Sequence, residues 1–386
     1  MNYPQHHVRA DEASAAQEGP EVSGKVANAG GHDGMKSEYH RYTERKILFI
    51  TACIIAAFLL LGISICIGAA GIDFWEAYDL LFKHLAGTTY DMGTVPFIHD
   101  YVIWNVRLPR ALFALVGGAG LAVGGAVMQS VMRNPLADPY TTGISSGALL
   151  GVAVAIILGL TVSGSHLNDV GLVVNAFIFA LIPMAFIMVI APMSNSSPAT
   201  LILAGVTVSY IFNALTTVLM ISTDAEELAI VYRWQVGSLS MITWNSLPIM
   251  VIANIAGAVA VMVVARQLNV LALGDDNAKS LGLNANNMRV LCVMITSFMV
   301  ASVISCVGII GFIGLICPHI IRILIDSDNR FVIPASAALG GVFLLGADIL
   351  ARCLSPIDAI PVGVILSFVG APIFLYLIIR QKKAMW

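Results

Sequence analysis

The chain has 386 residues, of which 58% are hydrophobic and 11% are charged, and its mean hydropathy is +0.87. Soluble domains carry about 25% charged residues, so the composition excludes an ordinary soluble enzyme. The formal net charge of −3, without a run of lysine or arginine, offers no basic surface for nucleic acid. We therefore predict an all-α, polytopic membrane protein with no nucleic-acid partner.

Residues 1–46 differ in composition from everything after them. They hold seven acidic residues, six basic residues and four of the eight histidines. Such a polar segment buries too little apolar surface to fold alone, which predicts a disordered cytoplasmic tail. It contains no apolar stretch typical of a cleavable signal peptide. The alternative is metal sensing by the four histidines of this segment, His6, His7, His32 and His40. Their spacing gives little support for a metal site, because only His6 and His7 are adjacent.

From residue 47 onward the chain consists of long uncharged stretches that predict a membrane domain over 47–386. A hydrocarbon core of about 30 Å takes about 20 helical residues to cross. The run 290–321 would be about 48 Å long as one helix, so we divide it into two spans near Gly308, Gly311 and Gly314. Ten spans are therefore predicted, within residues 47–69, 108–131, 143–160, 171–191, 200–221, 247–265, 290–321 (two spans), 331–350 and 361–379.

The distribution of lysine and arginine predicts the orientation. With ten spans and a cytoplasmic N-terminus, twelve basic residues near the membrane lie inside and five lie outside, which obeys the positive-inside rule. Both termini are then cytoplasmic in the cell membrane. The inner residues are Arg41, Arg45, Lys46, Arg133, Arg266, Lys279, Arg289, Arg322, Arg330, Arg380, Lys382 and Lys383, and the outer ones are Lys83, Arg107, Arg110, Arg233 and Arg352.

The second span is rich in small residues and includes a GxxxG pair, Gly120 and Gly124. Small residues at this spacing let helix backbones approach closely in lipid. We favour tight packing within one bundle as the explanation of this pattern; the alternative is a helix that slides or lines a wide pathway.

Ionisable residues are nearly absent from the predicted spans. Asp348 is the one acidic residue within them, and Arg352, four positions later, is its natural local ion-pair partner. Secondary transporters use intramembrane acids and histidines to couple ions to transport. The near absence of such residues suggests that the energy comes from outside this chain.

The connection over residues 267–288 is the longest on the predicted cytoplasmic side. It is moderately apolar, and glycines at 274 and 282 divide it into two short helical stretches. The stretch 274–280 lacks the glycine before Lys279 that a phosphate loop requires, so it is no nucleotide site. We predict a pair of short helices that dock against a cytoplasmic partner.

Sequence blocks in the membrane part resemble the permease subunits of type II ABC importers, the FecCD/BtuC-like family for iron–siderophore complexes, haem and cobalamin. The resemblance covers about residues 47–380, in the family's order. Its blocks are 107–110 (RLPR), 118–129, 133–139 (RNPLADP), 143–147 (GISSG), 203–205 (LAG), 234–239 (WQVGSL), 268–274 (LNVLALG), 311–319 (GFIGLICPH), 347–352 (ADILAR), 360–363 (IPVG) and 370–372 (GAP).

The resemblance implies the ten-helix type II importer fold and a homodimer with a pathway on its two-fold axis. It implies two ATP-binding cassette ATPase subunits below and an extracytoplasmic substrate-binding protein above. ATP and Mg would then be bound by the ATPases, so this chain would be no enzyme and would hold no cofactor. Where the family usually has a glutamate before Ile-Pro-Val-Gly, this chain has Ala359, with Asp358 one position earlier.

The resemblance also assigns roles to particular residues, none of them catalytic or metal-binding. Three outer arginines would dock the binding protein: Arg107, Arg110 and Arg352. The cytoplasmic gate would comprise Asn134, Leu136, Asp138, Ser197, Pro198 and Ala199. Coupling to the ATPase would involve Leu268, Asn269, Leu271, Leu273, Gly274, Ala278, Leu281 and Gly282.

The function implied is ATP-driven import of a chelated metal, such as an iron–siderophore, haem or corrinoid, by alternating access. The alternative is an ion-coupled secondary transporter without an ATPase partner.

Overall fold

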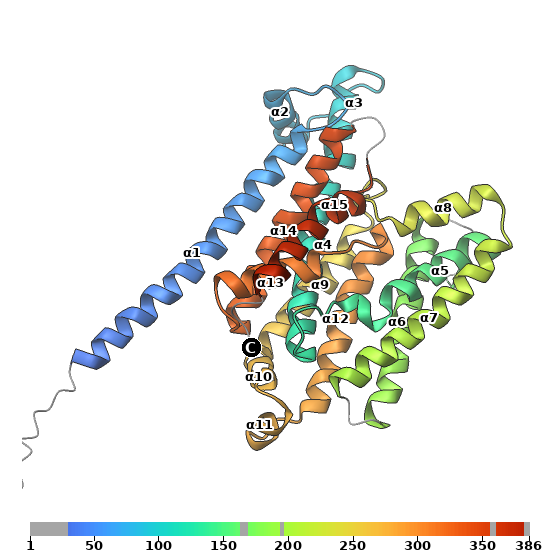
Figure 1. The fold of residues 1–386 in the computed structure, drawn as a ribbon. Coiled ribbons are helices and arrows are strands. Elements are labelled where there is room, and N and C mark those ends of the chain that lie inside the picture. Colours follow the sequence, from blue (N-terminus) through green and yellow to red (C-terminus); the bar gives the residue numbers. More distant parts are fainter. Residues whose placement is uncertain (1–29, 163–168, 194–196, 356–359, 382–386) are drawn as a thin grey trace, which may run out of the picture. The chain divides into compact units, whose positions relative to one another are not determined.

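The computed structural model describes residues 30–162, 169–193, 197–355 and 360–381. The chain divides into two units after Glu44, and the helical bundle belongs to the second, residues 45–386. The described residues form helices and no strand (Figure 1). The α-helices are α1 (Gly30–Cys66), α2 (Phe74–Leu85), α3 (Val95–Tyr101), α4 (Leu108–Met132), α5 (Ile144–Leu158), α6 (Asp169–Met193), α7 (Pro198–Ile221), α8 (Ala225–Gln235), α9 (Leu247–Val263), α10 (Ala265–Ala272), α11 (Asp275–Ser280), α12 (Ala285–Val307), α13 (Ile313–Leu324), α14 (Asn329–Leu354) and α15 (Val362–Gln381).

A helix occupies each of the predicted spans. Within the described residues, six of these regions are long and apolar enough to cross a membrane by themselves, and α9 with α10 forms a further candidate bent by 59°. The helices α5, α13 and α15 are apolar but shorter, so the number of ten crossings stays a prediction. This composition and arrangement make the chain an all-α integral membrane protein, as the sequence predicts.

One boundary differs from the sequence-based one, and the predicted break in the long apolar run is present. Helix α1 begins at Gly30 rather than at residue 47. Residues 30–46 contain no proline that would interrupt a helix before residue 47. The predicted tail is thus described only from residue 30, and residues 1–29 lie outside the described part. The long run 290–321 is broken as expected, between Val307 and Ile313. Both Gly308 and Phe312 have positive φ values there, which no helix can contain.

Helix α4 occupies the centre of the second unit, and every residue from Gly120 to Met132 is buried. It packs against α9, α12, α13 and α14. Its glycines bring the backbones together, because a methyl group at Gly118 would overlap the carbonyl of Gly340 and one at Gly125 would overlap that of Gly314. The small residues of this helix therefore serve tight packing within the bundle.

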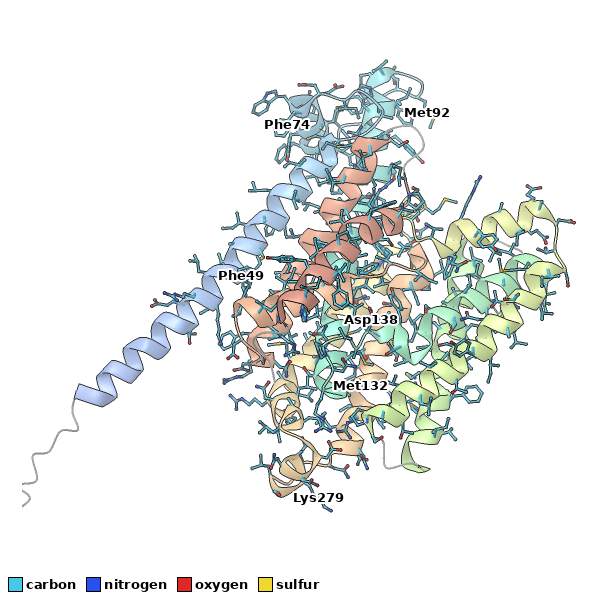
Figure 2. The ribbon with its side chains drawn as sticks, in the orientation of Figure 1. Phe49, Phe74, Met92, Met132, Asp138 and Lys279 are labelled. Atoms are coloured by element: carbon cyan, nitrogen blue, oxygen red, sulfur yellow. The ribbon has the colours of Figure 1, made fainter. Side chains whose placement is uncertain are left out.

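The two ends of the bundle carry different structures (Figures 1 and 2). Helices α2 and α3 lie at one end, labelled by Phe74 and Met92, and α10 and α11 lie at the other, labelled by Lys279. We call these the outer end and the inner end, following the orientation predicted from the lysine and arginine count.

Candidate functional site

The predicted pair of short helices is present at the inner end, as α10 and α11 with Gly274 between them. Gly274 has φ +104°, a value that favours glycine. Along α10 the buried residues Leu268 and Leu271 face α4 and α14, and Ala278 of α11 is also fully buried. These three residues attach the connection to the membrane helices.

Other residues of this connection face away from the bundle. Leu273 is 62% exposed and Leu281 is 65% exposed, each beside one of the two glycines. Gly282 has φ +79° and open space around it. Both leucines lie on the connection that the sequence predicts to dock against a cytoplasmic partner. The predicted coupling residues thus divide into an inward-facing group and an exposed group.

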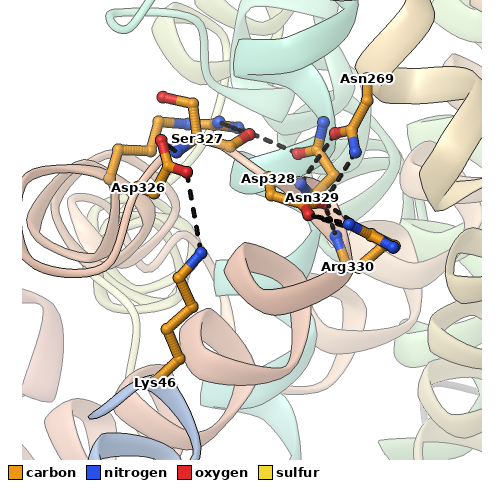
Figure 3. Close-up of polar contacts among 8 residues, drawn as sticks. Lys46, Asn269, Asp326, Ser327, Asp328, Asn329 and Arg330 are labelled. Atoms are coloured by element: carbon orange, nitrogen blue, oxygen red, sulfur yellow. Dashed lines mark hydrogen bonds and ion pairs between the residues drawn. The ribbon is translucent and has the colours of Figure 1, made fainter. Parts of the chain in front are cut away.

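Asn269 joins α10 to the start of α14 (Figure 3). Its amide donates to Asp328 Oδ1 at 2.7 Å, and its carbonyl oxygen accepts from the backbone N–H of Asn329 at 2.8 Å. Burial raises the pKa of Asp328, but hydrogen bonds from Arg330 and Asn269 outweigh burial and lower it to about 2. Asp328 is therefore ionised at neutral pH and caps α14 as a carboxylate.

The same corner continues into α4 and α13. The side chain of Asn329 accepts a hydrogen bond from Ser130 Oγ at 2.8 Å. Arg322 donates to Ser130 Oγ at 2.7 Å and to the carbonyl of Ala126 at 3.1 Å. Four helices, α4, α10, α13 and α14, are thus held together by polar contacts at the inner end.

Asp275, the first residue of α11, makes the second attachment. Its carboxylate pairs with Arg289 of α12, whose side chain is fully buried. Arg133, directly after α4, lies 3.6 Å from the same carboxylate oxygen. In the sequence, Arg133 and Arg289 count only as inner basic residues, and Asp275 carries no signal beyond being an acid beside Gly274, so their contact with one another was not predicted.

The predicted gate residues after α4 form a compact loop. The backbone N–H of Leu136 donates to Asn134 Oδ1 at 2.9 Å, and that of Tyr140 donates to Asp138 Oδ1 at 3.0 Å. Asp138 is 7% exposed, and burial raises the pKa of its carboxyl to about 6. Leu136 is 49% exposed. The loop is therefore held by its own side chains and leaves one leucine free.

The other predicted gate residues begin α7. Ser197 caps this helix by accepting from the backbone N–H of Thr200 at 3.2 Å, and Pro198 occupies the first helical turn, where it is tolerated. Ala199 is exposed. Their role as a gate stays a prediction.

The three outer arginines are buried inside the chain, with exposures of 4% for Arg107 and 7% for both Arg110 and Arg352. Arg110 and Arg352 pair with the fully buried Asp348 at 2.7 and 2.9 Å. Arg107 and Arg352 also donate to carbonyl groups of residues 64–67 at the end of α1, at 2.7–2.9 Å. The local Asp348–Arg352 pair is present, and contact with a binding protein stays a prediction for all three arginines.

These carbonyl contacts have a simple physical origin. The last carbonyl groups of a helix have no partner within it. Two guanidinium groups supply donors for the end of α1, and so attach α1 to α4 and α14. An arginine at the end of a span can thus be held by the neighbouring helix rather than by a partner protein.

Comparison with known proteins assigns the chain to a protein family. The model of the FecCD transport family matches residues 54–380. The chain belongs to the FecCD transport family. Its match covers nearly the whole helical bundle, including both ends described above.

Related permeases are similar to this chain over most of its length. The hemin transport system permease protein HmuU of Yersinia pestis is 35% identical over 331 residues, 84% of this chain and 95% of that protein. The vitamin B12 import system permease protein BtuC of Klebsiella pneumoniae is 38% identical over 280 residues, 72% of this chain and 83% of that protein. The iron(3+)-hydroxamate import system permease protein FhuB of Bacillus subtilis is 35% identical, over 84% of this chain and 80% of that protein.

A solved structure is also similar. It is described as an inward-facing conformation of a metal-chelate type ABC transporter, and it superposes with a TM-score of 0.74 at 28% identity. The match covers 86% of this chain and 98% of that chain. The fold is therefore that of an ABC importer permease, and the sequence-based assignment of family and fold class is confirmed.

Proposed function

We propose that this chain is the membrane-spanning subunit of an ATP-driven importer that moves a chelated metal, such as an iron–siderophore, haem or corrinoid, into the cytoplasm. Membership of the FecCD transport family supports this function, and the relatives are named for hemin, vitamin B12 and iron(3+)-hydroxamate. These cargoes share one property: the metal arrives already held by its chelator. The permease then needs shape and a pathway rather than metal ligands.

The observation that carries the proposal is the structure of the inner end. Helices α10 and α11 are anchored by buried residues and leave Leu273 and Leu281 exposed. This surface is suited to docking of an ATPase subunit, which would supply the energy for transport. The predicted spans hold few acidic residues that could couple transport to an ion gradient. Closure of two ATPases on ATP would shift the bundle between outward-open and inward-open states.

The other proposed partners are a second copy of the chain and an extracytoplasmic binding protein. A two-fold dimer presents the same surface twice, so a two-lobed binding protein can meet both halves at the outer end. In this arrangement both termini and the connection 267–288 lie in the cytoplasm.

Reconstitution tests the function directly. Alone in liposomes, the chain should neither hydrolyse ATP nor accumulate a chelated metal. Addition of its ATPase and binding protein should give uptake that requires ATP on the side of the liposome membrane that corresponds to the cytoplasm. Uptake by the chain alone under a proton gradient would support the alternative, an ion-coupled secondary transporter.

A substitution at the exposed surface tests the coupling assignment. Leu273→Glu places a charge on a side chain that is 62% exposed, so the bundle should fold, while co-purification with the ATPase should fall at least about tenfold. The matched control is Leu85→Glu at the outer end, where Leu85 is 63% exposed. Equal recovery of the ATPase with both variants would contradict the assignment.

A further inference from the structure

One carboxylate at the inner end connects three helices. Asp275 begins α11, and its Oδ1 contacts both Arg289 of α12 and Arg133, which lies 3.6 Å away at the end of α4. Arg289 is fully buried and also donates from Nε to the carbonyl of Val131, in the last turn of α4, at 3.4 Å. A displacement of α11 therefore acts on the end of α4 through two guanidinium groups.

The end of α4 continues directly into the loop 134–138. Arg133 has φ +48°, a left-handed conformation that is uncommon for a residue with a side chain. The backbone N–H of Asn134 donates to the carbonyl of Gln129 at 3.1 Å, which fixes the loop to the last turn of α4. Movement of Arg133 thus carries the loop with it, because no flexible linker separates them.

Hydrophobic contacts alone would not fix the position of α11 in this way. The helix has only six residues, and Ala278 is its one fully buried side chain. Charge-assisted hydrogen bonds are shorter and about twice as strong as neutral ones, and a guanidinium fixes direction as well as distance. The contact with the buried Arg289 therefore adds a directional constraint on α11 to the packing of Ala278.

We propose that Asp275 is a positioning residue that transmits movement of the ATPase-docking helices to the end of α4 and the loop 134–138. This inference rests on the proposed function and specifies how its two cytoplasmic elements are linked. Asp275 acts through Arg289 and Arg133 and touches neither substrate nor nucleotide. Asp79 of α2, an exposed acid at the outer end and away from the ATPase-docking helices, supplies the control.

The test uses the full transporter, with ATPase and binding protein, in proteoliposomes that import a haem, a ferric hydroxamate or cobalamin, whichever the wild type accepts. Uptake and ATP hydrolysis are measured in the same vesicles. Coupling between sites amounts to about 5–150-fold in typical proteins. We expect Asp275→Asn to lower the substrate imported per ATP at least about fivefold, with the KM for ATP unchanged.

Two further variants separate coupling from folding. Asp275→Glu keeps the carboxylate and should restore most of the ratio, and Asp79→Asn should leave it within about twofold of the wild type. If Asp275→Asn does not fold, Arg133→Gly replaces it. Glycine adopts the left-handed conformation of position 133 without strain, so this variant keeps the backbone and the Asp275–Arg289 pair while one of the two links is removed.

The outcomes distinguish the inference from the function on which it rests. A wild-type transporter that shows no ATP-driven uptake would overturn the proposed function. Uptake by the wild type together with an unchanged ratio in Asp275→Asn, or in Arg133→Gly, would overturn the inference alone. A defect in Asp275→Glu as severe as that in Asp275→Asn would also overturn it, because the carboxylate would then not be the element that matters.

Discussion

Arg110 and Asp348 lie 238 positions apart in the sequence, and their side chains form a buried ion pair at 2.7 Å. The Arg110–Asp348 pair joins α4 to α14, and Arg352, also in α14, pairs with the same carboxylate. Removal of one partner from a buried pair is costly because it leaves the other charge without compensation. Loss of either partner should therefore lower the stability of the folded chain.

Asp348→Ala should destabilise the chain strongly. The substitution leaves two guanidinium groups buried without a carboxylate, and breaking such pairs costs about 3–5 kcal/mol. Thermal unfolding of the purified chain in detergent measures the effect. Asp79→Asn is the matched control, because Asp79 is 57% exposed and pairs with the exposed Lys83, a type of pair worth about 0.2–1 kcal/mol at most. Similar midpoints for the two variants would show that the buried cluster contributes little.

The docking role predicted for the outer arginines can be tested at Arg107, which does not pair with Asp348. Arg107→Gln keeps a hydrogen-bond donor for the end of α1 and removes the charge. If Arg107 meets the binding protein, affinity should fall at least about tenfold, and the variant should depend less on ionic strength. Lys83→Gln, an exposed charge at the same end, is the control. Superimposable affinity–salt curves for wild type and Arg107→Gln would leave Arg107 a purely structural role.

Close helix contacts at α4 lead to a third prediction. Gly125→Ala should destabilise the bundle by about 1–3 kcal/mol or more, because the added methyl group would overlap the carbonyl of Gly314 in α13. Gly346→Ala is the control, since that position in α14 has open space around it. Here alanine should be neutral or stabilise the helix by up to about 1 kcal/mol. Equal loss of thermal stability in both variants would contradict the packing interpretation.

Much of this fold follows from the sequence because hydrocarbon length and glycine position act locally. The spans match helices, the run 290–321 breaks at Gly308, and α10 and α11 meet at Gly274, each for a reason visible within a few residues. The number of crossings does not follow in the same way. Helix α13 has 12 residues, about 18 Å, which is shorter than the hydrocarbon core, although its composition is that of a span.

The partners of the charged side chains could not be predicted from the sequence. Arg107 and Arg352 interrupt the positive-inside pattern, which suggests a surface role, yet their donors reach the carbonyl groups that end α1. Those contacts depend on how α1, α4 and α14 meet in three dimensions. For the same reason the bridge from Asp275 to Arg289 lay outside what spacing and composition reveal.

Asp138 gives a prediction on pH. Burial raises the pKa of its carboxyl from the ordinary 3.8 to about 6 in the folded chain. A raised pKa means that folding favours the protonated form, so this contribution to stability is complete below about pH 4 and is lost as the pH rises through about 6. The shift corresponds to about 3 kcal/mol, since one pKa unit is about 1.4 kcal/mol.

Asp138→Asn keeps a side-chain oxygen that can accept from the backbone N–H of Tyr140, and it removes the titration. The variant should therefore be more stable than the wild type at pH 7–8, and the difference should shrink as the pH falls to 4. Thermal unfolding of both proteins across pH 4–8 measures this difference and cancels the titration of all other carboxylates. A difference in stability that stays constant over this range would show that Asp138 does not titrate there in the folded chain.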